Sequence, residues 1–338
     1  MEELLKVEHL SVSYFTKAGE VEAVRDVSFA VNKGEVLAIV GESGCGKSAL
    51  CKSIMKLLPK TAKIKNGRIL ANGKDITNET EKTMSRLRGN LFSMVFQDPM
   101  TSLNPTIPIG KQIGEAVKIH NKNMTKEQIK NRVLELMKLV EIDRPKERMK
   151  QYPHEFSGGM RQRTVMAIAL AGNPKILFAD EPTTALDVTI QAQILDVFRK
   201  IQKKLEMATI FISHDLGVVA GVADRVAVMY AGKIVEIGTA EEIFYDPRHP
   251  YTCGLLQSLP ILSKGKEWLP TIPGMPPTLI HPPKGDAFAE RNPYALRIDY
   301  EKEPPMFRVT DTHYAATWLL DERASEAKKL IGERGNER

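Results

Sequence analysis

The stretch Glu35–Leu58, EVLAIVGESGCGKSALCKSIMKLL, decides the fold of this chain. It places an apolar run, a glycine-rich loop and a helical pattern in direct succession, and the loop matches G-x-x-x-x-G-K-[ST] at Gly41, Gly46, Lys47 and Ser48. Such glycines let backbone N–H groups turn inward around phosphate oxygens, while the helix N-terminus adds partial positive charge. The pattern predicts a phosphate-binding loop in which Lys47 reaches the β- and γ-phosphates and Ser48 ligates Mg²⁺, because a chance glycine turn would need neither the strand nor the helix.

A second motif, ILFADEP from Ile176 to Pro182, supplies two carboxylates at the end of an apolar run. Asp180 occupies the position from which an aspartate holds Mg²⁺ in loop-type NTPases. Glu181 is placed to orient and deprotonate a water in line with the γ-phosphate. Alone, such a pair is more often a solvated turn; together with the Gly41–Ser48 loop it indicates a Mg-ATP or Mg-GTP hydrolase.

Apolar runs without polar alternation predict strands that are buried on both faces of a parallel sheet, and hence an α/β fold. These runs are Glu35–Gly41, Phe92–Asp98, Lys175–Asp180 and Ala208–Ser213. Two further stretches, Gly67–Ile76 and Asp224–Gly238, read as antiparallel hairpins with glycine turns.

Two regions interrupt or follow this pattern. An amphipathic helix is predicted after Thr125, its N-cap, with Gln128 completing a capping box. The residues expected on its apolar face are Ile129, Val133, Leu136, Met137 and Val140. After about Ile243 prolines become frequent, which predicts an extended, turn-rich third region ending in a short charged helix or a frayed terminus.

Composition bounds the class of protein. The 338 residues are 42% hydrophobic and 27% charged with a net charge of +6, as in a globular protein with no polybasic block that would demand nucleic acid. The three cysteines do not form a disulfide framework, so a reducing compartment is expected, and Cys45 and Cys51 are interpreted as packing residues. The start lacks a signal-peptide core and no apolar run reaches the ~20 residues of a membrane span, so we expect a soluble, cytoplasmic chain.

Four short motifs narrow the function further, although each is weak alone. Ser157, in FSGGMRQR, begins a helix and forms a second anion-receptive N-terminus. Gln97 in FQDP and His214 in SHD each end a predicted strand, and Asp187 in TALD follows Glu181 closely.

In this order, the motifs resemble those of the nucleotide-binding subunit of an ABC transporter, over about the first 240 residues. The resemblance implies a P-loop NTPase core with an antiparallel β subdomain and an inserted helical subdomain. It implies that Glu181, His214 and Gln97 are catalytic, that Ser48, Gln97 and Asp180 hold Mg²⁺ through ATP, and that Asp187 is the D-loop. The ATP-binding residues that it implies are Tyr14, which stacks on adenine, Gly41, Ser43, Gly44, Cys45, Gly46, Lys47, Ser48 and Ala49.

The family's mechanism requires two such subunits packed head to tail. The signature, here Ser157, Gly158, Gly159 and Gln162, then acts in trans on the γ-phosphate held by the other subunit's loop. Gln97 would couple γ-phosphate sensing to the helical subdomain, and His214 would contact the γ-phosphate and the attacking water.

The segment Asp246–Pro260, DPRHPYTCGLLQSLP, resembles that of the oligopeptide and dipeptide (peptide/nickel) permease subgroup. The subgroup implies a heterodimer with a second, homologous ATPase, two transmembrane permease subunits and an extracytoplasmic solute-binding protein, at the cytoplasmic face of the membrane. Di- or oligopeptides are the expected cargo; nickel and oligosaccharides remain alternatives. The implied division is an ATPase domain over 1–243, with the helical subdomain at about 98–164, and an extension over 244–338.

Relatives in this subgroup commonly carry four cysteines for an iron–sulfur cluster, and here the corresponding positions are Asp286, Asn292, Asp299 and Thr317. We expect no cluster, because oxygen and amide groups replace the required thiolates. Two carboxylates and one amide are a thin set for a hard cation, so solvated polar residues are the favoured interpretation. Without a cluster, the fold of this segment would rest on a partner subunit or on aromatic and proline packing, for which the candidates are Phe288, Tyr294, Tyr314 and Trp318.

Two other functions remain open. One is a non-transport ABC ATPase acting on nucleic acid or ribosomes, which usually has two cassettes or long coiled coils. The other is a regulatory subunit with weak turnover.

Overall fold

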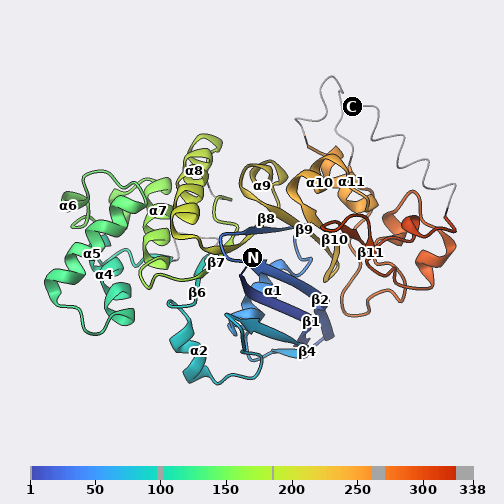
Figure 1. The fold of residues 1–338 in the computed structure, drawn as a ribbon, viewed down its shortest axis with the longest axis horizontal. Coiled ribbons are helices and arrows are strands. Elements are labelled where there is room, and N and C mark those ends of the chain that lie inside the picture. The colour runs from blue at the N-terminus through green and yellow to red at the C-terminus, as the bar shows by residue number, and fades with distance from the viewer. Residues whose placement is uncertain (1, 97–101, 185, 260–270, 325–338) are drawn as a thin grey trace. The chain divides into compact units, whose positions relative to one another are not determined.

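The computed structural model describes residues 2–96, 102–184, 186–259 and 271–324 (Figure 1). The chain forms two compact units: Met1–Leu5, Ala30–Val36 and Leu70–Ile212 make the first, and Lys6–Phe29, Leu37–Ile69 and Ser213–Arg338 make the second. Each unit is described by itself.

In the first unit, three parallel strands lie in the order β6 (Phe92–Val95), β7 (Ile176–Asp180) and β8 (Ala208–Ser213). Every residue of β7 and β8 is buried, which confirms strands covered on both faces. The predicted strand Phe92–Asp98 ends at Val95 instead, and Gln97 and Asp98 lie outside the described residues.

The helices of the first unit include the predicted amphipathic one. In α5, Thr125 and Gln128 form the expected reciprocal capping box, and four of the five predicted apolar-face residues are buried, Ile129 being half-buried. The elements α4, α5 and α7, green in Figure 1, pack against one another. The helical bounds are α2 (Glu81–Leu87), α4 (Ile109–His120), α5 (Lys126–Leu139), α6 (Pro145–Arg148), η1 (Pro153–Glu155), α7 (Gly158–Ala169) and α8 (Val188–Leu205).

Antiparallel strands confirm both predicted hairpins. β9 (Arg225–Tyr230) pairs with β10 (Lys233–Thr239) in the second unit. The last residues of β4 (Ala62–Ala71) pair with β5 (Lys74–Asp75) through Asn72–Gly73, both at positive φ, as tight hairpin turns require. The second unit also contains most of β1 (Glu3–Thr16) and of β2 (Gly19–Asn32), in the order β2-β1-β4.

The proline-rich region is part of the second unit's sheet. β3 (Val36–Val40) runs parallel to β9, and β10 pairs with β12 (Tyr314–Ala315), which in turn pairs with β11 (Phe307–Arg308). The C-terminal segment, which here means the described residues 271–324, thus adds a short ribbon, β11 and β12, to the edge of β10. Its backbone hydrogen bonds, which would be costly to leave unmade, are satisfied by the strand next to it.

Aromatic packing joins the same segment to the core of the second unit. Phe288 is 2% exposed and lies in one cluster with Val40, Tyr230 and Tyr251. The ring centroids of Tyr230, Tyr251 and Phe288 lie 4.6 to 5.4 Å apart, in tilted and edge-on arrangements that aromatic pairs favour. The prediction that Phe288 packs is confirmed. The remaining helices of this unit are α1 (Lys47–Ile54), α9 (Leu216–Val222), α10 (Ala240–Tyr245), α11 (Pro250–Gln257), η3 (Ala289–Arg291), η4 (Arg297–Tyr300) and η5 (Trp318–Leu320).

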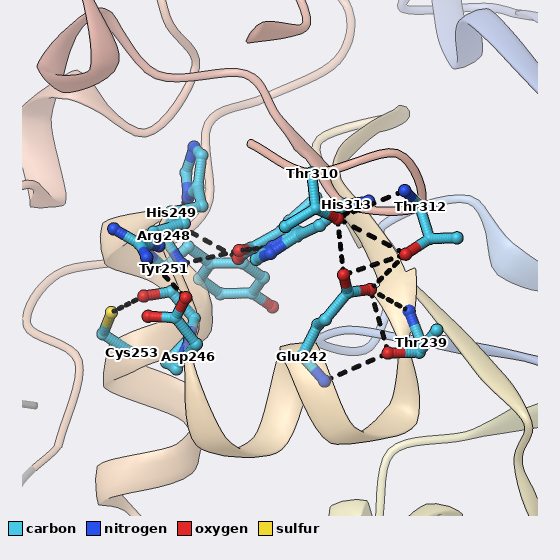
Figure 2. Close-up of polar contacts among 12 residues, drawn as sticks. Thr239, Glu242, Asp246, Arg248, His249, Tyr251, Cys253, Thr310, Thr312 and His313 are labelled. Atoms are coloured by element: carbon cyan, nitrogen blue, oxygen red, sulfur yellow. Dashed lines mark hydrogen bonds and ion pairs between the residues drawn. The ribbon is translucent and has the colours of Figure 1, made fainter. Parts of the chain in front are cut away.

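Polar contacts around Glu242 complete this attachment (Figure 2). The Glu242 carboxylate in α10 accepts hydrogen bonds from Thr239, Thr310 and Thr312. Burial would raise the pKa of Glu242, but these hydroxyls and the Thr239 N–H outweigh it and lower the pKa to about 2. Nearby, Glu236 and His313 form a fully buried pair at 2.7 Å. The threonines and His313 therefore hold the strand ribbon onto α10 and β10.

Among the described residues, no helix combines the length and the apolar character that crossing a membrane requires.

Candidate functional site

The predicted phosphate loop lies in the second unit and connects β3 to α1. Gly41 (φ 151°) and Gly46 (φ 105°) adopt a backbone conformation that favours glycine. A Cβ at Gly41 would lie 2.1 Å from the carbonyl oxygen of Met229, and one at Gly46 would lie 2.1 Å from that of Ala23. Two of the motif's glycines are therefore required by close backbone approach as well as by conformation.

Lys47 is almost fully buried and folds back over this loop. Its Nζ donates to the carbonyl oxygens of Gly41 at 2.7 Å and Glu42 at 2.9 Å, and it lies 3.6 Å from Cys45 Sγ. A buried ammonium needs such partners, and phosphate oxygens could supply stronger, charge-assisted ones. Burial raises the pKa of the Cys45 thiol, and Cys51 is fully buried, so both behave as packing residues, as predicted.

Two other predicted residues belong to the same unit. Tyr14 lies near the end of β1, half-buried, and burial raises the pKa of its hydroxyl. His214 is exposed and lies just before Asp215, whose side chain caps α9 by accepting from the N–H groups of Gly217 and Val218.

The carboxylate pair lies in the first unit at the end of β7. Asp180 is 6% exposed and closes the strand, as predicted. Glu181 has a φ of 47°, which is uncommon for a residue with a side chain and is enriched at functional sites. Its backbone N–H donates to the Ile212 carbonyl at 3.0 Å, and its carboxylate accepts from the Thr184 hydroxyl at 3.0 Å. This contact, which sequence analysis missed, orients the Glu181 carboxylate; a hydroxyl three residues after a carboxylate was the available signal.

The signature and the D-loop lie together in this unit. Ser157 caps α7 by accepting from the Met160 N–H, and Asp187 caps α8 by accepting from the Ile190 N–H. A Cβ on Gly159 would lie 2.6 Å from an Ile190 methyl carbon, so a small residue is required where the two helices begin. The two signature glycines lie at the start of α7. Gly158 is exposed, whereas Gly159 is buried against Ile190.

Gln162 differs from the other signature residues. It is fully buried in α7, and neither its amide nitrogen nor its amide oxygen has a hydrogen-bond partner among the described residues. Gln97, the remaining predicted catalytic residue, lies outside the described residues.

The four positions at which the resemblance implied cluster cysteines are buried, so the expectation of solvated residues is wrong. Asp286 and Asn292 are each 7% exposed, and Asp299 and Thr317 are fully buried. The physical reason is backbone folding: the Asp286 N–H donates to the Asp299 carbonyl at 2.7 Å, which draws the two stretches together.

Three of these side chains have one satisfied and one unsatisfied polar atom. Asp286, Asn292 and Asp299 each accept from a nearby backbone N–H, at 2.9, 2.9 and 2.5 Å. Within the described residues, the other carboxylate oxygen or the amide nitrogen has no partner. Burial raises the pKa of Asp286 to about 6 and also raises that of Asp299. The described residues contain no group of three or more His, Cys, Asp or Glu side chains placed to hold a metal ion.

Comparison with known protein families matches two parts of the chain. Residues 24–184 match the ABC transporter family, and residues 235–298 match the oligopeptide/dipeptide transporter C-terminal region. The second match begins in β10 and includes the buried Asp286 and Asn292.

Curated relatives match over nearly their full length. The chain is 61% identical to the oligopeptide transport ATP-binding protein OppD of Bacillus subtilis (strain 168), over 94% of this chain and 89% of the relative. It is 56% identical to the dipeptide transport ATP-binding protein DppD of Lactococcus lactis subsp. cremoris (strain MG1363), over 96% of this chain and 93% of the relative.

Solved structures match about seven tenths of the chain. One is cbiO1 from Clostridium perfringens, part of the ABC transporter complex cbiONQ, with a TM-score of 0.64 and 30% identity over 73% of this chain and 92% of that one. Another is a dimeric ATP-binding cassette bound to ADP and phosphate, with a TM-score of 0.62 and 24% identity over 70% of this chain and 98% of that one, which is similar in fold.

Proposed function

Since this chain belongs to the ABC transporter family, in its group of oligopeptide and dipeptide transport ATP-binding proteins, we propose that it binds and hydrolyses ATP to power peptide import through partner membrane subunits. The observation that carries the proposal is the 61% identity over 94% of the chain, because it includes the phosphate loop and the C-terminal region together. We propose domain bounds of 1–243 for the ATPase, with the helical subdomain at about 98–164, and 244–338 for the extension.

Nucleotide binding centres on the phosphate loop. Tyr14 stacks on adenine, and the backbone of Gly41–Ala49 surrounds the phosphates. The Lys47 ammonium exchanges its present carbonyl partners for phosphate oxygens. Ser48 and Asp180, with Gln97, would hold Mg²⁺; hydroxyl and carboxylate oxygens are the hard donors that this ion takes, and the ion supplies charge neutralisation of the phosphates.

For the hydrolysis step, we assign Glu181 the role of general base for the attacking water. Its carboxylate already accepts a hydrogen bond from the Thr184 hydroxyl, and its backbone is in the left-handed region. His214 and Gln97 would contact the γ-phosphate or the water. Because Glu181 must accept the proton, replacing its carboxylate by an amide should slow hydrolysis strongly while leaving the shape of the site intact.

A second, homologous ATPase subunit completes the site. Ser157, Gly158 and Gly159 begin α7, and this helix N-terminus would meet the γ-phosphate of the partner, with Gln162 supporting the helix from its buried side. The partners further include two membrane permease subunits and an extracytoplasmic solute-binding protein, with this chain on the cytoplasmic face of the membrane. We propose no role in nucleic-acid binding and no iron–sulfur cluster.

The test replaces Glu181 by Gln in the assembled transporter. We expect ATP turnover and peptide uptake to fall by roughly 100-fold or more, the usual contribution of a general base, with nucleotide affinity retained. Glu206→Gln is the matched control, since Glu206 is also a glutamate at positive φ (49°) but lies at the end of α8. Turnover and uptake that survive Glu181→Gln would contradict the catalytic assignment and favour a regulatory subunit.

Cargo is tested separately. With the solute-binding protein present, di- or oligopeptides should stimulate ATPase activity, whereas stimulation by nickel or oligosaccharides alone would reassign the cargo. Co-purification with nucleic acid or ribosomes in place of membrane subunits would favour the non-transport alternative.

A further inference from the structure

A buried arginine from the C-terminal segment contacts the phosphate loop directly. Arg291, the last residue of η3, is 6% exposed. Its two terminal nitrogens donate to the two carboxylate oxygens of Glu42 at 2.7 and 2.9 Å. Glu42 is the second residue of the phosphate loop. Such two-fold arginine–carboxylate contacts are among the stronger and more directional hydrogen bonds in proteins.

The rest of the guanidinium is also engaged. Arg291 Nε donates to the Pro273 carbonyl at 2.8 Å, and a terminal nitrogen donates to the Tyr230 hydroxyl at 3.2 Å. The guanidinium carbon lies 5.7 Å from the ring centre of Tyr230 and 5.9 Å from that of Phe288, within the range of cation–π attraction. The Glu42 carboxylate is the main cause of a raised pKa at Arg291. In the docked segment the buried charge is therefore paired and hydrogen-bonded, as a buried ion requires.

The backbone of Glu42 is held from two sides. Its N–H donates to the Tyr251 hydroxyl at 2.8 Å, and its carbonyl accepts from Lys47 Nζ at 2.9 Å. Tyr251 and Arg291 both come from the region after residue 243, whereas Lys47 is the loop's phosphate ligand. Glu42 thus ties the C-terminal segment to the backbone of the phosphate loop, beside the carbonyl that Lys47 would leave when phosphate binds.

A cavity is lined by residues of both the phosphate loop and this C-terminal region. Glu42, Ser43 and Gly44 on one side, and Pro276, Pro277 and Leu279 on the other, line a space of about 300 Å³. The Leu279 carbonyl accepts from the Glu22 N–H at 2.9 Å, which fixes the proline stretch beside β2. The loop therefore keeps room to adjust next to Ser43 and Gly44 but is anchored at Glu42.

We propose that Arg291 is a positioning residue that pre-orders the phosphate loop through Glu42, so that docking of the C-terminal segment and nucleotide binding are thermodynamically coupled. The inference rests on the proposed nucleotide site. Pre-ordering removes part of the ordering cost that binding would otherwise incur, so the loop binds phosphate more tightly when Arg291 is in place. Because such coupling is reciprocal, bound nucleotide must in turn stabilise the docked segment.

The first experiment measures nucleotide affinity of the full-length protein, with a fluorescent N-methylanthraniloyl-ATP and with MgADP. Arg291→Met should raise Kd by about 10-fold, within the usual range of coupling between sites, and Arg291→Lys should raise it less. In the assembled transporter KM for ATP should rise similarly while kcat stays within about two-fold. Arg297→Ala is the control, since Arg297 is 95% exposed in the same segment and pairs with Glu301.

A double-mutant cycle and hydrogen exchange complete the test. Glu42→Gln and Arg291→Met combined should cost less affinity than the two separate effects summed, because both act through one contact. In the wild type, MgADP should slow amide exchange over residues 285–300, and this protection should disappear in Arg291→Met.

Three outcomes separate the possibilities. A lowered melting temperature with unchanged Kd, KM and exchange protection would show that Arg291 only stabilises the fold, and it would overturn the inference. If Arg291→Met does not fold, Arg291→Lys decides by the same criteria. Failure of the wild type to bind either nucleotide would instead refute the proposed function itself.

Discussion

The buried carboxyl group of Asp286 predicts a specific pH dependence. One carboxylate oxygen accepts from the Phe288 N–H at 2.9 Å, and the other has no hydrogen-bond partner among the described residues. Burial is the main cause that raises the pKa from 3.8 to about 6, and the Phe288 N–H acts in the opposite direction. Asp299 and Glu303 raise the pKa further, and Lys233 lowers it.

The sign and size of the effect follow from linkage. The folded state holds a proton on Asp286 more tightly than the unfolded state, so its contribution to stability is fully present below pH 3.8 and is lost as pH rises through about 6. Each pH unit between the two pKa values corresponds to about 1.4 kcal/mol, so ionising this group in the folded protein costs about 3 kcal/mol. Asp286→Asn removes the titration and keeps an acceptor for Phe288.

The assay is denaturant unfolding of nucleotide-free protein from about pH 5 to about pH 8, followed by Trp318 fluorescence in a Trp268→Phe background. Trp318 reports this segment, since its indole N–H donates to the Lys302 carbonyl at 2.9 Å. Over this range the wild type should lose about 1.4 kcal/mol more stability than Asp286→Asn, because only about one pH unit of the range lies below the folded pKa of about 6.

The slope with pH is the readout, because the buried amide adds an offset that does not depend on pH. Asp311→Asn, whose side chain is 89% exposed, should keep the wild-type slope. Equal slopes for the wild type and Asp286→Asn would refute the reasoning.

Two further predictions concern the loop and the buried polar positions. Gly46→Ala should abolish nucleotide binding in the N-methylanthraniloyl-ATP titration, because its Cβ would lie 2.1 Å from the Ala23 carbonyl oxygen. Gly34→Ala is the control and should bind normally, since Gly34 is also at positive φ but a Cβ there would have nothing within 4 Å. Wild-type affinity in Gly46→Ala would contradict the geometry. Purified full-length protein should contain iron and acid-labile sulfide far below cluster stoichiometry, because clusters are held by thiolates, and both elements at cluster stoichiometry would show that other ligands suffice.

Features that depend on neighbouring residues could be predicted from sequence. The strand, loop and helix around Lys47, the Thr125–Gln128 capping box and the Asn72–Gly73 hairpin all occur where the residue pattern indicated. Each is specified by contacts within a few residues, such as a cap, a turn conformation or an apolar period. The motifs of the site were predictable for the same reason.

Features that depend on residues distant in sequence were missed. Asp286, Asn292, Asp299 and Thr317 read as polar, solvated positions, yet the chain folds over them. Their burial depends on backbone pairing between Asp286 and Asp299, for which the sequence has no period or cap. The strand ribbon that adds β12 to β10 was missed for the same reason, since strands of two residues have too little pattern to detect.

By itself, the sequence determined the class of this protein and the chemistry available to it: a phosphate loop, a strand-terminal carboxylate pair and a second helix start with anion-binding character. Only the tertiary structure decided that the C-terminal segment contacts that loop through Arg291 and Glu42. These two residues are 249 positions apart, and either one alone resembles an ordinary surface charge in the sequence. The physical reason is that a buried guanidinium is tolerated only in a setting where a carboxylate, a tyrosine, a phenylalanine and a proline carbonyl surround it together. No local pattern encodes such a setting; it exists only once the aromatic cluster has packed.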